Sequence, residues 1–217
     1  MAQYGILRLQ KYDGGAVRGI DTHVERRATS SRTNPDIDFD KSARNYDLQS
    51  QYQGTFHSRI KNVLEREGIG KTRKNAVLLA ELLFTASPTF FDGKTQDEIR
   101  QYFTDCYNFV AEKYGGENII SAMVHLDEKT PHMHLCFVPI TEKGRLSSKD
   151  IIGGPKGLVG WQDKFYEYMH EKYPDITRGT PVKVSHRKHI PPFMFKVAGE
   201  LYDHYGEICG AINNLGH

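Results

Sequence analysis

Three histidines that lie close together in the sequence have the side-chain type and spacing of a metal site. His132 and His134 flank a single residue, so on a strand both imidazoles would point to the same face. His125 ends the preceding apolar run, and a short polar connection, Asp127 to Pro131, separates it from the pair. If the two runs form an antiparallel hairpin, the three rings converge.

Three neutral imidazoles suit a divalent cation and leave coordination positions open for substrate or water. We favour Mn²⁺, with Mg²⁺, Ni²⁺, Co²⁺ and Zn²⁺ as alternatives. Such an ion acts as a Lewis acid on a phosphoryl or carbonyl oxygen. The competing interpretation is three unrelated histidines packed in a core, but an apolar strand pair gains little by burying imidazoles without a ligand.

The hydrophobic pattern indicates the elements that position these residues. It predicts strands at residues 3–10, 76–86, 118–126 and 132–140, and a brief one at 45–48. It predicts helices at residues 55–67, 96–114, 161–173 and 193–213. Thr95 and Glu98 form a capping box before the second helix. Residues 21–50 are otherwise expected to be mostly loop and residues 178–192 a basic loop, which gives an α+β fold.

Composition limits the class of protein. The chain has 217 residues, of which 38% are hydrophobic and 26% charged, so one globular domain with room for an appended lobe is expected. No apolar run approaches the roughly 20 residues that span a bilayer. The first residues lack the pattern of a signal peptide. Cys106, Cys136 and Cys209 are widely spaced and odd in number, so we expect reduced thiols in a cytoplasmic protein.

Basic residues gather in segments although the formal net charge is only +2. Brought onto one face, such segments would follow a phosphate backbone, although solvated surface explains them equally well. The candidates for DNA contact are Arg26, Arg44, Arg73, Lys74, Ser147 and Lys149. A turn with polar caps is an equal explanation for the last two.

Several motifs in the same order resemble the plasmid mobilisation and recombination relaxases, the Mob/Pre or MobV group of the HUH nuclease superfamily. The run from His125 to His134 is the most specific. The other matching segments are residues 7–11, 22–26, 45–48, 73–78 and 146–149. The resemblance implies a central antiparallel sheet with the histidine strands at its centre and helices packed on it. It also implies one nicking domain over residues 1–217, the N-terminal part of a longer protein, with residues 178–217 as a helical C-terminal extension.

The activity implied by the resemblance is nicking of one DNA strand at a plasmid origin of transfer. The enzyme would join itself to the 5′ phosphate and later religate the strand. Its partners would be single-stranded or hairpin origin DNA and the conjugative coupling or secretion machinery of a bacterium. No ATP is expected, and no phosphate-binding glycine loop is present in the sequence.

The resemblance also implies that the nucleophile is a histidine, His23, in a His-x-Glu-Arg segment. A neutral imidazole is a competent nucleophile near neutral pH. We expect Glu128 to orient its other nitrogen, with Asp127 as second candidate. Tyr46 is the rival nucleophile, although a lone tyrosine more often packs or stacks on a base.

Other functions stay open at this point. A rolling-circle replication initiator of the same superfamily would carry its tyrosine on a later helix, where Tyr166 and Tyr168 are candidates. A non-covalent metallohydrolase would attack with water and need no separate nucleophile. A DNA-binding protein with a structural metal would need a fourth protein ligand.

Overall fold

The computed structural model describes residues 2–31, 34–179, 201 and 204–205. The chain divides into two compact units, Met1–Gly179 and Thr180–His217. The basic loop and the helix expected beyond residue 179 therefore lie almost entirely outside the described residues. Among the helices that are described, none combines the length and the apolar character needed to cross a membrane.

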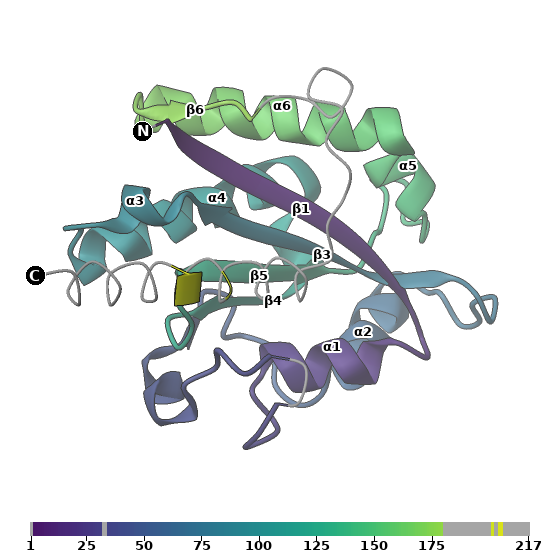
Figure 1. Cartoon of the computed structure of the whole chain (residues 1–217). Coiled ribbons are helices and arrows are strands. Elements are labelled where there is room, and N and C mark those ends of the chain that lie inside the picture. Colours follow the sequence, from purple (N-terminus) through teal and green to yellow (C-terminus); the bar gives the residue numbers. More distant parts are fainter. Residues whose placement is uncertain (1, 32–33, 180–200, 202–203, 206–217) are drawn as a thin grey trace, which may run out of the picture. The chain divides into compact units, whose positions relative to one another are not determined.

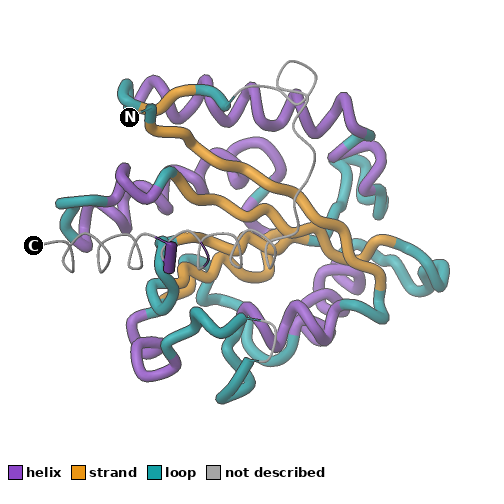
Figure 2. The backbone as a smooth tube through the Cα atoms, in the orientation of Figure 1, coloured by secondary structure: helices purple, strands orange, loops and turns teal. Residues whose placement is uncertain are grey.

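A mostly antiparallel sheet forms the frame of the first unit (Figures 1 and 2). Within the described residues its strand order is β2-β4-β5-β3-β1-β6, and only β1 and β6 run parallel. The strands are β1 (Gln3–Asp13), β2 (Tyr46–Asp47), β3 (Val77–Ala86), β4 (Ile119–His125), β5 (His132–Phe137) and β6 (Ile176–Thr177). The predicted strands are confirmed, and the two histidine-bearing strands are inner strands of the sheet.

Helices cover both faces of this sheet (Figure 1). The described helices are α1 (Val17–Val24), η1 (Phe39–Arg44), α2 (Phe56–Arg66), α3 (Pro88–Phe91), α4 (Gln96–Tyr114), η2 (Gly116–Asn118), α5 (Ser148–Ile152) and α6 (Pro155–Lys172). One core cluster joins the sheet to α3, α4 and α6, and a second joins its opposite face to α1 and α2. The capping box of Thr95 and Glu98 starts α4 as predicted.

Strand alternation decides which face carries the histidines. Met133 and Leu135 belong to the core under α4 and α6, whereas Cys136 belongs to the core under α1 and α2. His132 and His134 have the same parity as Cys136 and therefore face α1 and α2. The site consequently lies on the face that the two N-terminal helices cover.

The prediction of loop at the start of residues 21–50 is wrong for residues 21–24, because residues 17–24 form helix α1. Val17, Ile20 and Val24 recur at helical spacing and are all buried. Gly14, Gly15 and Gly19 masked this pattern. Helix α6 likewise begins at Pro155, earlier than expected, since proline suits the first turn of a helix.

Two of the three cysteines lie in the described part of the chain, and both are reduced. Cys106 and Cys136 are free and buried in the two cores, as the sequence predicted. Cys209 lies outside the described residues.

Candidate active site

Four histidine rings gather on the α1/α2 face of the sheet, three of them from the β4–β5 hairpin. His125 and His132 are directly opposed in the β4–β5 register, and His134 lies two residues farther along β5. The ring centroids are 5.1 Å apart for His125 and His132, 4.8 Å for His125 and His134, and 5.0 Å for His132 and His134. The hairpin spacing in the sequence had predicted this convergence.

Main-chain carbonyls fix the orientation of two of these rings. Nε2 of His125 lies 2.9 Å from the carbonyl oxygen of Val24, and Nδ1 of His132 lies 2.9 Å from that of Thr130. A carbonyl only accepts, so each of these nitrogens must carry the proton. The other nitrogens, Nδ1 of His125 and Nε2 of His132, therefore carry lone pairs.

A carboxylate orients the third ring. Nδ1 of His134 hydrogen-bonds a carboxylate oxygen of Glu81 on β3, and the hydroxyl of Tyr12 on β1 donates to the other oxygen at 2.5 Å. Nε2 of His134 is buried and has no hydrogen-bond partner among the described residues. A buried, unpartnered polar nitrogen is costly unless a ligand occupies it.

Two of these nitrogens have the spacing of ligands on one cation. Nδ1 of His125 and Nε2 of His132 lie only 3.3 Å apart although both carry lone pairs. Two nitrogens bound about 2.1 Å from one ion lie roughly 3.0–3.4 Å apart. Carbonyl or carboxylate acceptors behind ligating imidazoles are the usual support of such a site. This pair therefore has the spacing and the supports of transition-metal ligands, although the predicted trio of His125, His132 and His134 is not among the groups of described residues whose ligand atoms all lie within 4.8 Å of one another.

Electrostatics keep the cluster neutral. Burial, followed by the neighbouring His134 and His132 rings, lowers the pKa of His125 to about 2. Burial, with His132 and His23 nearby, also holds the pKa of His134 well below its ordinary value. Both imidazoles are therefore neutral at physiological pH, which is the form that binds a metal ion.

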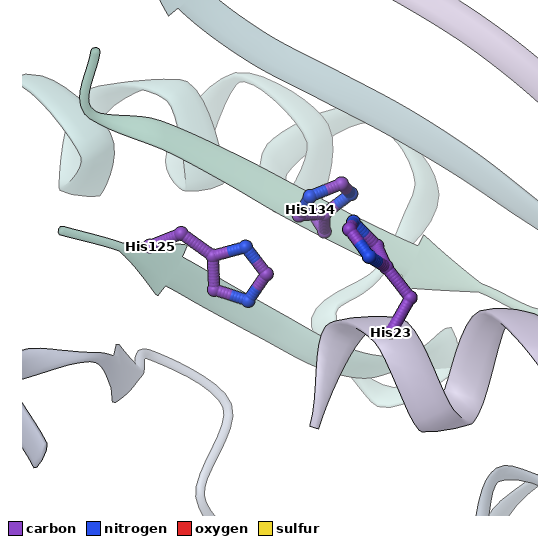
Figure 3. A group of neighbouring side chains, drawn as sticks. All are labelled: His23, His125 and His134. Atoms are coloured by element: carbon purple, nitrogen blue, oxygen red, sulfur yellow. The ribbon is translucent and has the colours of Figure 1, made fainter. Parts of the chain in front are cut away.

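The fourth ring, His23, comes from the last turn of α1 and faces the hairpin (Figure 3). Its centroid lies 5.0 Å from that of His134 and 5.8 Å from that of His125. Burial, with help from the nearby Arg26 charge, lowers the pKa of His23. No described residue hydrogen-bonds its ring, so His23 presents a neutral imidazole beside the cluster.

Candidate ligand atoms form two overlapping groups in the described part of the chain. One consists of His23, His125 and His134, and the other of His125, Glu128 and His132. Within each group the nitrogen or oxygen atoms lie within 4.8 Å of one another. Distance alone therefore permits His23 to serve as either a ligand or a separate reacting group.

Arg26, a predicted DNA contact, instead binds acidic side chains of the protein in this structure. Nε and Nη2 donate to both oxygens of Asp127 at 2.9 and 2.8 Å, and Nη2 also donates to Glu128 at 2.6 Å. Nη1 donates to the carbonyl of His23 at 3.0 Å. The side chain is only 9% exposed. Arg26 therefore ties the end of α1 to the β4–β5 loop.

Arg26 also ends the helix. Its φ of 49° is the only left-handed value of a non-glycine residue in the described chain. Such a conformation is uncommon for a residue with a long side chain and persists where surrounding contacts hold it. The fork to Asp127 and Glu128 supplies those contacts, and it places His23 three residues earlier against the hairpin.

Asp127 accepts hydrogen bonds from side chains that hold the fold together, and it makes none with His23 in the described structure. It is 1% exposed and accepts hydrogen bonds from Arg26, Ser42 and Asn45. Burial alone would raise the pKa of this carboxyl, but these three donors hold it well below its usual range. Asp127 thus anchors η1 and the start of β2 beneath the site.

Glu128 lies beside the histidine cluster, but the structure does not give it the expected contact with His23. One oxygen accepts from Arg26 and the other from Asn34 at 2.7 Å. The first oxygen lies 3.6 Å from Nε2 of His132. Glu128 therefore borders the open side of the His132 ring, and neither it nor Asp127 orients His23 here.

Tyr46, the rival nucleophile, lies on the opposite face of the sheet from the histidines. Tyr46 pairs with Val124 on β4, so its side chain shares the face of Val124 and lies opposite the histidines. The guanidinium of Arg100 on α4 covers its ring at 4.0 Å. Its hydroxyl is buried without a partner, and burial raises its pKa to about 12.

The initiator-type tyrosines are also on the wrong face. Tyr166 and Tyr168 of α6 pack against the core under α4 and α6. Tyr168 contacts Phe109 of α4, with ring centroids 5.5 Å apart. The sheet itself separates both residues from the histidine cluster.

The remaining predicted DNA contacts fall in separate places. Arg44 is exposed at the end of η1. Arg73, Ser147 and Lys149 line one groove beyond the start of β3, and Lys74 is exposed next to it. The hydroxyl of Ser147 also caps α5 by accepting from the backbone of Asp150, which agrees with the polar-turn interpretation.

Sequence reasoning missed Glu81 and Tyr12. The signal for Glu81 was present, because it is the only charged residue in the apolar stretch Val77–Ala86. A lone acid in a buried strand requires a partner. Its partner, His134, is far away in the sequence and becomes visible only through the β3–β5 register.

Comparison with known proteins decides the family. The sequence model of the plasmid recombination enzymes matches residues 1–197. The chain belongs to this family. A plasmid recombination enzyme of Bacillus thuringiensis is 39% identical over 93% of this chain and 44% of its own length. A type 3 enzyme of Mammaliicoccus lentus is 38% identical over 92% of this chain and 49% of its own. The chain thus spans less than half of these relatives.

Solved relaxase domains share the fold. The MobM relaxase domain bound to pMV158 origin-of-transfer DNA, a manganese-bound crystal structure, matches with a TM-score of 0.81 and 33% identity. The match covers 90% of this chain and 98% of that one. The same domain with a longer, 26-nucleotide origin DNA matches with a TM-score of 0.71. The expected α+β relaxase fold is confirmed.

Proposed function

We propose that this protein is a relaxase that nicks one DNA strand at a plasmid origin of transfer and attaches itself to the 5′ phosphate through His23. The observation that supports this most directly is the neutral imidazole of His23, which makes no hydrogen bond to the described residues and faces a convergent three-histidine cluster. MobM relaxase domains with the same fold are bound to origin DNA. We assign the nicking domain to residues 1–217, as the sequence predicts, and its work to the bacterial cytoplasm.

Nδ1 of His125 and Nε2 of His132 and His134 would hold the metal ion. Mn²⁺ is the first candidate, because the related MobM structures are manganese-bound. Such an ion, when bound, polarises a non-bridging phosphate oxygen and offsets its developing charge. Glu81, Thr130 and the Val24 carbonyl support the three rings from behind.

His23 acts as the nucleophile and the other three histidines as metal ligands, because only those three have an acceptor for their second ring N–H. Ligating imidazoles almost always donate their second N–H to an acceptor. His125, His132 and His134 each have such an acceptor, and His23 has none among the described residues. The ring of His23 is therefore not committed to an acceptor in the described structure and is available to react with the phosphate.

The reaction is an in-line displacement at phosphorus. A lone-pair nitrogen of His23 forms the P–N bond while the P–O3′ bond breaks. The imidazole ring loses its N–H proton, and the departing 3′ oxygen takes up one proton to become a hydroxyl, so no net proton is gained or lost. The phosphoramidate stores the reactivity for religation, so no ATP is consumed, and attack by a 3′ hydroxyl reverses each step.

A direct test is to incubate the protein and Mn²⁺ with single-stranded oligonucleotides from the pMV158 origin, the DNA bound in the MobM structures. Digestion at neutral pH and mass spectrometry then locate the adduct. We expect a 5′-phosphoryl group on His23. Adducts on Tyr166 or Tyr168 would identify an initiator-type enzyme. Multiple-turnover hydrolysis without an adduct would identify a metallohydrolase.

A further inference from the structure

The position of His23 depends on how the end of α1 is held. Its imidazole makes no hydrogen bond to the described residues, so the main chain of the last helical turn determines where the ring lies (Figure 3). The carbonyl of Val24 and the side chain of Arg26 join this turn to the β4–β5 hairpin. A further contact, through Glu25, joins it to a different element.

Glu25 ends α1 as its C-cap residue, and Arg59 of α2 binds both of its carboxylate oxygens. Nη1 of Arg59 donates to Oε1 at 2.8 Å, and Nη2 donates to Oε2 at 3.2 Å. Nη1 also donates to the main-chain carbonyl of Ile120 on β4 at 3.0 Å. The side chains of Glu25 and Arg59 are only 13% and 6% exposed. Arg59 therefore connects the end of α1 both to α2 and to the sheet.

This contact restricts rotation of the turn that carries His23. Successive helical residues project about 100° apart, so Glu25 and His23 point to roughly opposite sides of α1. A contact to both carboxylate oxygens fixes direction as well as distance, because the two N–H···O bonds have to form together. Rotation of α1 that swings His23 away from the hairpin would therefore break the contact between Glu25 and Arg59.

Stability alone does not account for a charged pair at this place. Arg59 lies in the buried stripe of α2 with Phe56, Ile60 and Val63, where an apolar side chain would pack. Its Nε is buried and has no hydrogen-bond partner among the described residues. Replacing a buried ion pair by apolar residues of similar volume is often neutral or stabilising. What the pair adds is direction, because hydrophobic packing is non-directional.

We propose that Glu25 and Arg59 are positioning residues that set the angle at which the imidazole of His23 faces the histidine cluster. The inference rests on the proposed nicking function and deepens it. No hydrogen bond joins either side chain to the four histidines in the described structure, so the pair acts through the main chain of α1. A misplacement of about 1 Å can cost about 100-fold in rate, so a small rotation of this turn is sufficient.

The test removes the charges while keeping the side chains similar in size. The double variant carries Glu25→Gln and Arg59→Met. Its matched control, Asp105→Asn with Lys172→Met, makes the same kind of change at a pair 3.2 Å apart that joins α4 to α6 on the other face of the sheet. Arg59→Lys is a second variant, which keeps the charge but cannot bind both oxygens of Glu25. It decides the question if the double variant does not fold.

Adduct formation is measured in a single turnover at saturating DNA and Mn²⁺, and the two affinities and the urea stability are measured separately. The double variant should form the adduct about 10- to 100-fold more slowly. Its affinities should stay within about twofold of the wild type, because the loss concerns the reacting geometry. Its stability should equal or exceed that of the wild type. Arg59→Lys should show a smaller loss of rate, and the control should react at the wild-type rate.

Nuclear magnetic resonance of the metal-free protein reports the position of the ring without the reaction. The imidazole signals of His23 are assigned by their loss in His23→Ala. They should move in the double variant and in Arg59→Lys, and they should stay in place in the control. A role confined to stability would leave these signals unchanged in folded protein.

A wild-type rate in the folded variants overturns the inference, as does an equal loss in the control. Recovery of the rate at saturating DNA and Mn²⁺ also overturns it, because the pair would then act on binding. Unmoved His23 signals would do the same, because the pair would then act elsewhere. Failure of the nicking function is distinct, since the wild-type protein would then form no adduct on His23.

Discussion

Glu81 determines which nitrogen of His134 faces the cluster. Its carboxylate accepts the Nδ1 proton of the ring, and this leaves Nε2 buried without a hydrogen-bond partner among the described residues. Tyr12 holds the second carboxylate oxygen and so fixes the rotation of the acid. The three side chains come from neighbouring strands, β1, β3 and β5, which makes the sheet register part of the site.

We therefore expect Glu81 substitutions to weaken metal binding. Glu81→Gln keeps an acceptor but loses the charge, and Glu81→Ala loses both. Loss of such a support typically costs about 10- to 100-fold in metal affinity, with alanine at the upper end. Electron paramagnetic resonance titration with Mn²⁺ measures this directly. Glu142→Gln, at an exposed loop position, is the control, and equal affinities for all variants would remove Glu81 from the site.

Replacing His23 separates its two possible roles. As nucleophile, His23→Ala should abolish the covalent DNA adduct, a loss of more than about 10³-fold, because the reacting atom is gone. Its Mn²⁺ affinity should stay at the wild-type value. A fall in affinity would instead place His23 among the ligands. His57→Ala, at an exposed histidine of α2, should change neither quantity.

Arg26→Lys tests whether this residue is scaffold or DNA contact. Lysine keeps the charge but cannot make the fork to both oxygens of Asp127, so a buried pair is broken. We expect the free energy of unfolding to fall by about 2–4 kcal/mol in urea denaturation. Arg27→Lys, at a more exposed neighbour, should lose less than about 1 kcal/mol. Wild-type stability in Arg26→Lys would contradict the scaffold role.

Acidification should destabilise the metal-free protein. The pKa values of His125 and His134 are lowered by folding, so below about pH 6.5 the unfolded state binds more protons than the folded state. Stability is then full above that pH and falls below it, by up to about 1.4 kcal/mol per pH unit for each ring. Urea unfolding after chelation, between about pH 7.5 and 5.5, measures the slope. His125→Asn should roughly halve it, and a flat profile would show that the rings titrate normally.

Tyr46→Phe should leave cleavage intact. The hydroxyl makes no hydrogen bond within the described structure and lies on the far face of the sheet, so its removal deletes no contact with the site. Cleavage rates should stay within about twofold, and stability should be unchanged or higher by up to about 1 kcal/mol. Loss of the covalent adduct in this variant would return Tyr46 to the chemistry.

What the sequence could predict was local. The convergence of His125, His132 and His134 follows from strand alternation and a short connection, both of which can be read within ten residues. The helix from Gln96 to Tyr114 carried its own capping box and apolar stripe. Both predictions used only residues that are close together in the sequence, and neither required knowledge of a contact between distant segments.

What the sequence could not predict depended on pairing between distant segments. Tyr46 was a plausible nucleophile until its register with Val124 placed it on the other face, and a shift of one residue would have reversed that result. Arg26 looked like a phosphate ligand because its acceptors, Asp127 and Glu128, are about a hundred residues away. The same holds for Glu81 and His134.

The contact between His125 and Val24 involves a backbone oxygen, which no change of side chain at position 24 can delete. The segment that carries His23 thereby buttresses a ring of the hairpin directly. A displacement of the end of α1 would move His23 and remove the acceptor of His125 at the same time. A change in the path of the main chain at the end of α1 therefore affects the positions of His23 and His125 together, whereas a side-chain substitution can alter one without the other.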